Sequence, residues 1–105
     1  MKLSITPGQV YTFKLNSGEE LIAKVSLASN DVVNDWLEIE HPVSVAPGPQ
    51  GMGLVPSLFT ADPEEKLQLN TASVSLYALT DDPVKMKYIE ATTGIKVPEK
   101  KIILG

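Results

Sequence analysis

The sequence predicts a mainly β protein with one C-terminal helix. Five short strands are expected to form a strongly bent antiparallel sheet that curls into a small open barrel. Two observations predict the sheet. Apolar residues alternate with a period of two through residues 10–27, 36–45 and 73–79, and turn-forming residues separate these runs. A third observation, a helix start at residues 80–83, predicts the helix. A flat two-layer α+β sheet is the alternative.

One domain is expected, because 105 residues can bury a single modest core. We assign the barrel to residues 10–79, the helix to residues 83–93 and a tail to residues 95–105. No apolar run approaches the roughly 20 residues that span a bilayer, and residues 1–7 are not expected to act as a signal peptide. With no cysteine, disulfides and thiolate zinc sites are excluded, and we expect a reducing compartment. The net charge of −4, without any arginine, argues against a polyanion held by bulk electrostatics.

Residues 10–27 are predicted to form a β-hairpin with one buried face. Asn16, Ser17 and Gly18 lie between its halves, and Gly18 can take a positive φ without steric cost. The residues expected on the buried face are Tyr11, Phe13, Leu15, Leu21, Ala23, Val25 and Leu27, and those opposite the first three are Val10, Thr12 and Lys14.

A third strand is predicted at residues 36–45, followed by a loop at residues 46–53, whose sequence A-P-G-P-Q-G-M-G is the strongest loop signal in the chain. Pro42 either makes this strand an edge or marks a bulge. One face is expected to carry Leu37, Ile39, His41, Val43 and Val45, and the other Trp36, Glu38 and Glu40.

Short apolar runs complete the sheet. Residues 54–60 are expected to form a strand interrupted by Pro56, residues 61–66 an acidic turn, and residues 67–69 resume the alternation. Residues 73–79 are the last strand. Because apolar residues occur on both of its faces, we expect this last strand to be central in the sheet.

The helix is predicted with Asp82 as N-cap and Pro83 at the first helical position. Gly94 suits the left-handed position after the helix, and Ile95 the apolar contact that often follows it. The apolar stripe of this helix is expected to consist of Val84, Tyr88, Ala91 and Thr92.

Both ends of the chain leave alternatives open. Leu3 and Ile5 either add a strand or pack on the mouth of the barrel. The tail carries three lysines, Pro98 and the apolar residues 102–104. It either adds an edge strand or pairs with a neighbouring subunit.

The hairpin resembles the first half of the Sm motif of Sm-like proteins, which are small β-barrels of the SH3-like open kind. In that motif, alternate apolar residues precede Leu-x-x-Gly-x-x-apolar-x-small-x-apolar. The matching residues here are Tyr11, Phe13, Leu15, Gly18, Leu21, Ala23 and Val25. Ala23 stands where the family usually has Gly. The resemblance covers residues 10–79 and makes residues 46–65 an enlarged variable loop.

The second half of that motif, apolar-Arg-Gly-x-Ser/Asn-apolar, resembles residues 69–74. Asn70 and Thr71 replace the Arg and the Gly. In Sm rings this Arg stacks on or pairs with RNA, so its loss argues against binding of uridine-rich RNA. The family's other RNA contact is an Asp-x-x-x-Asn run after the second strand, where this chain has similar residues one position out of register. The resemblance therefore gives as candidate RNA contacts Asn30, Asp31, Asn34, Asn70 and Thr71. Turn chemistry, in which Asn and Asp bond to their own backbone, is the alternative for these residues.

The helix is a further departure, since the constant helix of Sm proteins is N-terminal. A hairpin, a Val-Pro-containing strand and a terminal helix ending in T-T-G-I resemble short Sm-like proteins of tailed phages of cyanobacteria. The resemblance implies a phage origin and the cytoplasm of an infected bacterial host.

No catalytic residue, metal site or cofactor is expected. His41 is the only histidine and is expected to be structural, while Asp62, Glu64 and Glu65 suit a solvated turn better than a cation site. Ser/His/Asp, paired-His, phosphate-loop and dinucleotide patterns do not occur. A small hydrolase that depends on His41 is a remote third option.

Self-association is expected instead, because Trp36, either Tyr77 or Leu79, and residues 102–104 would be exposed on a monomer. Sm-like barrels join the fourth strand of one subunit to the fifth strand of the next. The resemblance therefore implies a cyclic homo-oligomer, roughly five- to seven-fold, with residues 54–69 and 73–79 as its two edges. A monomer whose tail covers its own edge is the alternative.

Two functions follow from these observations. The first is a phage-encoded, ring-forming adaptor that binds RNA or protein through its loops. The second is a protein-binding or structural homo-oligomer that has lost RNA binding. The resemblance favours the first, whereas the missing Arg and the acidic charge favour the second. The fold by itself does not decide between them, and no membrane partner is expected.

Overall fold

The computed structural model describes residues 4–28, 36–49 and 51–93. Its strands are β1 (Val10–Leu15), β2 (Glu20–Ala28), β3 (Trp36–Gly48), β4 (Gly51–Pro56), β5 (Leu67–Asn70) and β6 (Val74–Leu79). A short 3₁₀ helix, η1 (Thr71–Ser73), joins β5 to β6, and the α-helix α1 (Asp82–Thr93) follows β6. The described chain is therefore mainly β with one C-terminal helix, as predicted.

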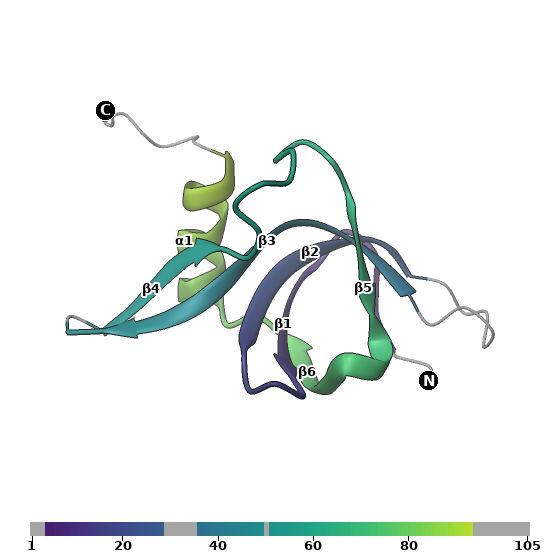
Figure 1. Cartoon of the computed structure of the whole chain (residues 1–105), viewed down its shortest axis with the longest axis horizontal. Helices are drawn as coiled ribbons and strands as arrows, with labels where there is room; N and C mark the ends of the chain where they lie inside the picture. The colour runs from purple at the N-terminus through teal and green to yellow at the C-terminus, as the bar shows by residue number, and fades with distance from the viewer. Residues whose placement is uncertain (1–3, 29–35, 50, 94–105) are drawn as a thin grey trace.

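All strand pairs are antiparallel, and the sheet is open and strongly curved (Figure 1). The strand order is β4-β3-β2-β1-β6, and β5 also pairs with β3. The prediction of five strands is wrong by one, because the segment 57–66 separates β4 from β5. Both strands pair with β3, through Val43 with Pro56 and through Ile39 with Leu67.

The predicted hairpin is confirmed as β1 and β2. Phe13 lies opposite Leu21, and the turn between them contains Gly18 with a φ of +97°. The Gly18 amide donates a hydrogen bond to the Leu15 carbonyl at 2.9 Å. This left-handed turn residue lets β2 return along β1 with the expected faces turned inward.

The concave face of the curved sheet holds the main core, which we call the inner cluster. Phe13 and Val25 lie at its centre and are fully buried. Ile5 packs against the cluster, so the N-terminal segment covers the core rather than adding a strand; Leu3 lies outside the described residues. The inner cluster consists of Tyr11, Phe13, Leu21, Ala23, Val25, Leu37, Ile39 and Val74.

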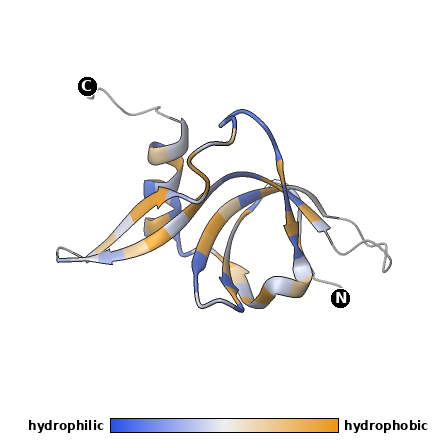
Figure 2. Cartoon of the chain, viewed as in Figure 1, coloured by the Kyte–Doolittle hydropathy of each residue, from blue (hydrophilic) through white to orange (hydrophobic). Residues whose placement is uncertain are grey.

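The convex face holds a second core beneath α1, which we call the helix-side cluster (Figures 1 and 2). Its buried members are Val10, Ile22, Val43 and Tyr88, and its partly buried members are Val45, Leu54, Val84 and Ile89. The predicted helix stripe is confirmed for Val84, Tyr88 and Thr92, whereas Ala91 is exposed and Ile89 packs in its place.

Helix α1 starts one residue earlier than predicted. The Lys85 amide donates to the Asp81 carbonyl at 2.8 Å, which makes Asp81 the N-cap and leaves Pro83 in the second helical position. The expected roles of Gly94 and Ile95, and the tail, lie outside the described residues.

The predicted continuous face of β3 is wrong because the strand contains a bulge. Its register against β2 shifts between the pairs Ile22–Val43 and Lys24–Glu40, which leaves one extra residue in β3. A bulge re-aims the side chains that follow it. Leu37 consequently packs in the inner cluster, while Val43 packs in the helix-side cluster. The expectation of a bulge at Pro42 is thus confirmed.

The predicted loop at residues 46–53 is also wrong. Strand β3 continues to Gly48 and β4 begins at Gly51, with Pro47 opposite Met52. Proline and glycine are tolerated there because, among the described strands, none pairs with the outer edges of this end of the hairpin. Gly51 has a φ of +107°, which suits a tight reversal.

The last strand, β6, is an edge strand and not the central strand predicted. It pairs only with β1 among the described strands. Val74 points into the inner cluster, but Leu76 and Leu79 are 68% and 61% exposed. Leu76 lies opposite Lys14 and Leu79 opposite Tyr11, so the two exposed side chains lie on different faces of the strand.

Candidate functional site

The bulge in β3 organises the surface on which a candidate site is found. His41 has a φ of +51°, the only positive value at a non-glycine residue in the described chain. Pro42 follows it and has no amide to donate. At this point the outer edge of β3 changes partner, from β5 before the bulge to β4 after it.

Tyr88 of α1 is inserted at the same bulge. The Lys24 amide donates to the Tyr88 hydroxyl at 3.1 Å, and this hydroxyl donates to the Glu40 carbonyl at 3.0 Å. Lys24 and Glu40 are register partners, so the hydroxyl bridges the backbone of β2 and β3 where the ladder is disturbed. Burial, chiefly, raises the pKa of Tyr88 to about 12, so the phenol stays protonated and can donate.

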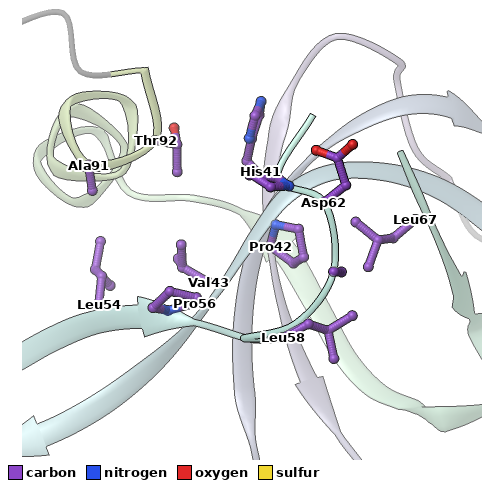
Figure 3. A pocket seen from close by; sticks show the side chains of 12 residues that line it. His41, Pro42, Val43, Leu54, Pro56, Leu58, Asp62, Leu67, Ala91 and Thr92 are labelled. Carbon is purple, nitrogen blue, oxygen red and sulfur yellow. The ribbon is translucent and has the colours of Figure 1, made fainter. Parts of the chain in front are cut away.

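Beside the bulge lies a half-open apolar groove of about 240 Å³. Figure 3 shows the end of α1, with Ala91 and Thr92, on one side and Asp62 and Leu67 on the other. His41 lies between these two sides (Figure 3). The remaining lining residues are Pro42, Val43, Leu54, Pro56, Leu58, Ala61 and Pro63.

The groove lies where the two cores meet. Leu67 packs against the inner cluster, whereas Val43 and Leu54 belong to the helix-side cluster. Side chains that line the groove therefore also pack in the cores on both faces of the sheet. Its polar groups are few, which is the usual character of a site for an apolar ligand group.

The polar side chains around the groove are partly engaged. Asp62 Oδ1 accepts a hydrogen bond from the Glu64 amide at 3.0 Å, which holds the acidic turn. Thr92 Oγ1 donates to the Tyr88 carbonyl at 2.8 Å, within the helix. Lys66 Nζ lies 3.7 Å from Glu38 Oε2 and 3.9 Å from Glu40 Oε2.

A second candidate surface is the outer edge of β6 with its exposed Leu76 and Leu79. The predicted exposure of Trp36 is also confirmed, at 46%. At the other end of the strand order, Met52 and Val55 of β4 are exposed as well. Phe59, in the segment between β4 and β5, is 81% exposed. Apolar side chains of this size at open strand edges are typical of protein–protein interfaces.

The structure does not bring the predicted RNA-contact residues into one described site. Asn30, Asp31 and Asn34 lie outside the described residues. Asn70 caps η1, because its side-chain oxygen accepts a hydrogen bond from the Ala72 amide at 3.0 Å. Thr71 is buried, with 3% of its surface exposed. The hydrogen bond between Asn70 and the backbone two residues later agrees with the alternative of turn chemistry.

Asn16 in the β1–β2 turn holds η1 in place. Its amide donates to the Ser73 carbonyl at 2.7 Å, and its Nδ2 donates to the Ala72 carbonyl at 2.9 Å. Its Oδ1 accepts a hydrogen bond from Ser75 Oγ at 2.5 Å. The chain from η1 to the start of β6 is thus bonded to the turn between β1 and β2.

Within the described residues, no group of three or more histidine, cysteine, aspartate or glutamate side chains is placed to hold a metal ion. No helix in that part of the chain is long and apolar enough to span a membrane.

No protein-family model matches the sequence, and no curated protein matches it either.

The sequence does not predict the groove. It gives His41 only as a lone histidine and Asp62 only as part of an acidic turn. No spacing in the sequence links residues 41–43 to residues 91–92, because only the packing of α1 on the sheet brings them together.

Proposed function

We propose that the chain is a non-enzymatic module that assembles with copies of itself through the open edges of its sheet. The observation that carries this proposal is β6, an edge strand of six residues in which Leu76 and Leu79 are exposed. A soluble monomer with such an edge would be prone to uncontrolled pairing.

The composition of β6 supports this proposal. Its sequence V-S-L-Y-A-L contains no charged residue and no proline, which are the usual means of protecting an edge strand. An unprotected apolar edge suits a strand that is covered in the assembled state. By contrast, the sheet's other terminal strand, β4, carries glycine and Pro56.

The two edges differ, and this difference favours a closed ring over a two-fold dimer. A contact between β6 of one subunit and the β4–β5 edge of the next is head-to-tail, and such contacts form rings when the rotation closes. β4 is as long as β6, at six residues each. The exposed side chains of Met52 and Val55 lie on that strand.

An Sm-like, SH3-like open barrel is the fold we propose for this module. In support, the first strand lies between the second and the last, and η1 joins the last two strands. Two departures stand against a close relation: the helix is C-terminal, and Asn70 and Thr71 replace the Arg and Gly of the motif. The phage origin remains a prediction from the sequence.

Of the two functions considered, the observations favour the protein-binding or structural homo-oligomer. Asn70 Oδ1 is engaged in capping and Thr71 is buried, which supports this choice. A titration with short oligo-uridine and oligo-adenosine at low salt separates the two functions. Oligonucleotide binding that weakens as the salt concentration rises would instead support the RNA-binding function.

The decisive experiment measures mass in solution, by light scattering during gel filtration and by native mass spectrometry. We expect one defined oligomer for the native chain, and smaller species for Leu76→Lys and Leu79→Lys. Met86→Lys is the matched control, because Met86 is also 62% exposed but lies on α1. A native chain that is monomeric at every concentration, or an equal effect of Met86→Lys, would refute the proposal.

A further inference from the structure

We propose that the groove beside the β3 bulge is the docking site for the chain's own C-terminal segment, residues 96–104, with the apolar side chains of residues 102–104 seated in it. The groove shares no residue with the β6 edge, but Leu54, Pro56 and Leu67 in its lining belong to the β4–β5 edge of the proposed assembly. The test below therefore measures docking of the tail separately from the mass of the assembly.

The first argument is position. Ala91 and Thr92 line the groove, and α1 ends at Thr93. Helix α1 therefore ends at the rim of the groove. The eight residues 94–101 can span at most roughly 26–29 Å when extended. That reach allows the chain to reverse and return, and Gly94 and Pro98 are residues suited to such a reversal.

The second argument is shape and polarity. The groove holds about 240 Å³, and most of its lining side chains are aliphatic or proline. A protein cavity of about 150 Å³ takes a benzene molecule, so this groove has room for at least one branched aliphatic side chain. Ile102, Ile103 and Leu104 are three such side chains in succession. Leu58, 53% exposed at the groove, would be covered by them.

The third argument is charge. Asp62 lines the groove, and Glu64 and Glu65 follow it in the same exposed turn. The neighbouring Lys66 does not offset them, because it lies near Glu38 and Glu40. The tail carries the opposite sign, with Lys96, Lys100 and Lys101 against Glu99. Exposed ion pairs contribute little energy, so the charges orient the segment and the apolar side chains supply the affinity.

The chain's own tail is favoured over the tail of a second copy by mass action. A segment tethered by a short linker meets its site at an effective concentration in the millimolar range. A second copy reaches such a concentration only inside an assembly. The weak affinity expected of a few aliphatic side chains therefore suffices within one chain.

The absence of cysteine makes a direct test possible. A nitroxide is attached through Gly105→Cys, and paramagnetic relaxation is measured at the backbone amides of the full-length chain labelled with ¹⁵N. We expect a loss of signal at residues 61–67 that does not change on dilution. The loss should disappear in Ala91→Trp, which fills the groove from α1. It should persist in Met86→Trp, an exposed position elsewhere on α1.

A second variant keeps the test decisive if Ala91→Trp does not fold. Replacing Ile102, Ile103 and Leu104 by serine changes only the tail, and it should also abolish the signal loss at residues 61–67. A loss that decays along α1 from Thr93, without an excess at residues 61–67, would overturn the proposal. So would a loss seen only between chains, in a mixture of spin-labelled ¹⁴N chains and unlabelled ¹⁵N chains.

Discussion

The inner cluster and the helix-side cluster lie on opposite faces of the same strands, but they are held together differently. The inner cluster is built from side chains of the sheet itself, and curvature of the sheet closes it. The helix-side cluster has four buried residues, one of which, Tyr88, comes from α1. One core follows from strand pairing, and the other exists only when a distant helix docks.

This difference shows in the polar chemistry of the two regions. Phe13, fully buried in the inner cluster, contributes through apolar burial alone. Tyr88 contributes apolar burial and also a hydroxyl that bridges the backbone at the bulge. We infer that the inner cluster sets most of the stability, whereas the helix-side cluster sets the position of α1 and hence the shape of the groove.

The largest effect is expected for Phe13→Ala, which opens a cavity in the inner cluster. Truncation of a fully buried phenylalanine costs about 3–5 kcal/mol of the free energy of unfolding. Urea unfolding at one fixed protein concentration measures it. Met86→Ala, at an exposed position of α1 outside the proposed assembly edges, is the control and should change stability by less than about 0.5 kcal/mol. Similar losses for the two variants would contradict the assignment of the inner cluster as the main core.

A smaller loss is expected for Tyr88→Phe, which keeps the ring but removes the hydroxyl. The Lys24 amide and the Glu40 carbonyl then lack the group that bridges them, at a cost of about 1–3 kcal/mol. Tyr77→Phe is the matched control, because the Tyr77 hydroxyl accepts only an exposed hydrogen bond from the Ser4 amide. If both variants lose the same stability, the bridge at the bulge has no special role.

The bridge also predicts a dependence on pH. The pKa of Tyr88 is raised from 10.0 to about 12, so the folded state keeps a proton that the unfolded state has already released. Protonated Tyr88 therefore contributes fully to the free energy of unfolding below pH 10. This contribution is lost as the pH rises towards 12, by up to about 1.4 kcal/mol per pH unit. Urea midpoints measured from pH 9 to about pH 12 should show this fall in Tyr77→Phe, whereas Tyr88→Phe should show a shallower one. Parallel curves for the two variants would show that the Tyr88 hydroxyl makes no pH-dependent contribution to the free energy of unfolding.

The smallest effect is expected at the joint between the two regions. His41 occupies a left-handed backbone conformation that glycine adopts without strain. His41→Gly should therefore raise the free energy of unfolding by up to about 1 kcal/mol, and His41→Ala, which retains the Cβ, should give no such gain. Thermal unfolding of the two variants measures the difference. A gain for alanine equal to that for glycine would show that the imidazole, and not the backbone, is the source of strain.

Much of the fold could be predicted because its signals are local. The hairpin of β1 and β2 follows from alternation around Gly18, and α1 from the acidic residues and Pro83 at its start. The errors occur at β3, β4 and β6. The glycines and prolines of residues 46–53 suggested a loop because the sequence does not reveal that this ribbon projects beyond the sheet.

The candidate surfaces were predicted only in part. Alternation predicts exposure of Trp36 and of either Tyr77 or Leu79, and the structure exposes Trp36 and Leu79. The groove was not expected, because it combines residues of β3, β4, β5, α1 and the segment 57–66, which only the folded chain brings together. Asn70 was considered for RNA contact from its place in a motif, and its hydrogen bond to the Ala72 amide became visible only with η1.

The amino-acid sequence alone determined where most of the strands and the helix form, because alternation, turn residues and caps act between neighbours a few positions apart. It did not determine the ribbon at residues 46–53. The tertiary structure decided which face each strand presents after the bulge, which strand lies at the edge and where α1 packs. These features depend on pairings such as Ile22 with Val43, and on Tyr88 reaching Lys24 and Glu40. Such contacts join residues tens of positions apart, and no local pattern specifies them.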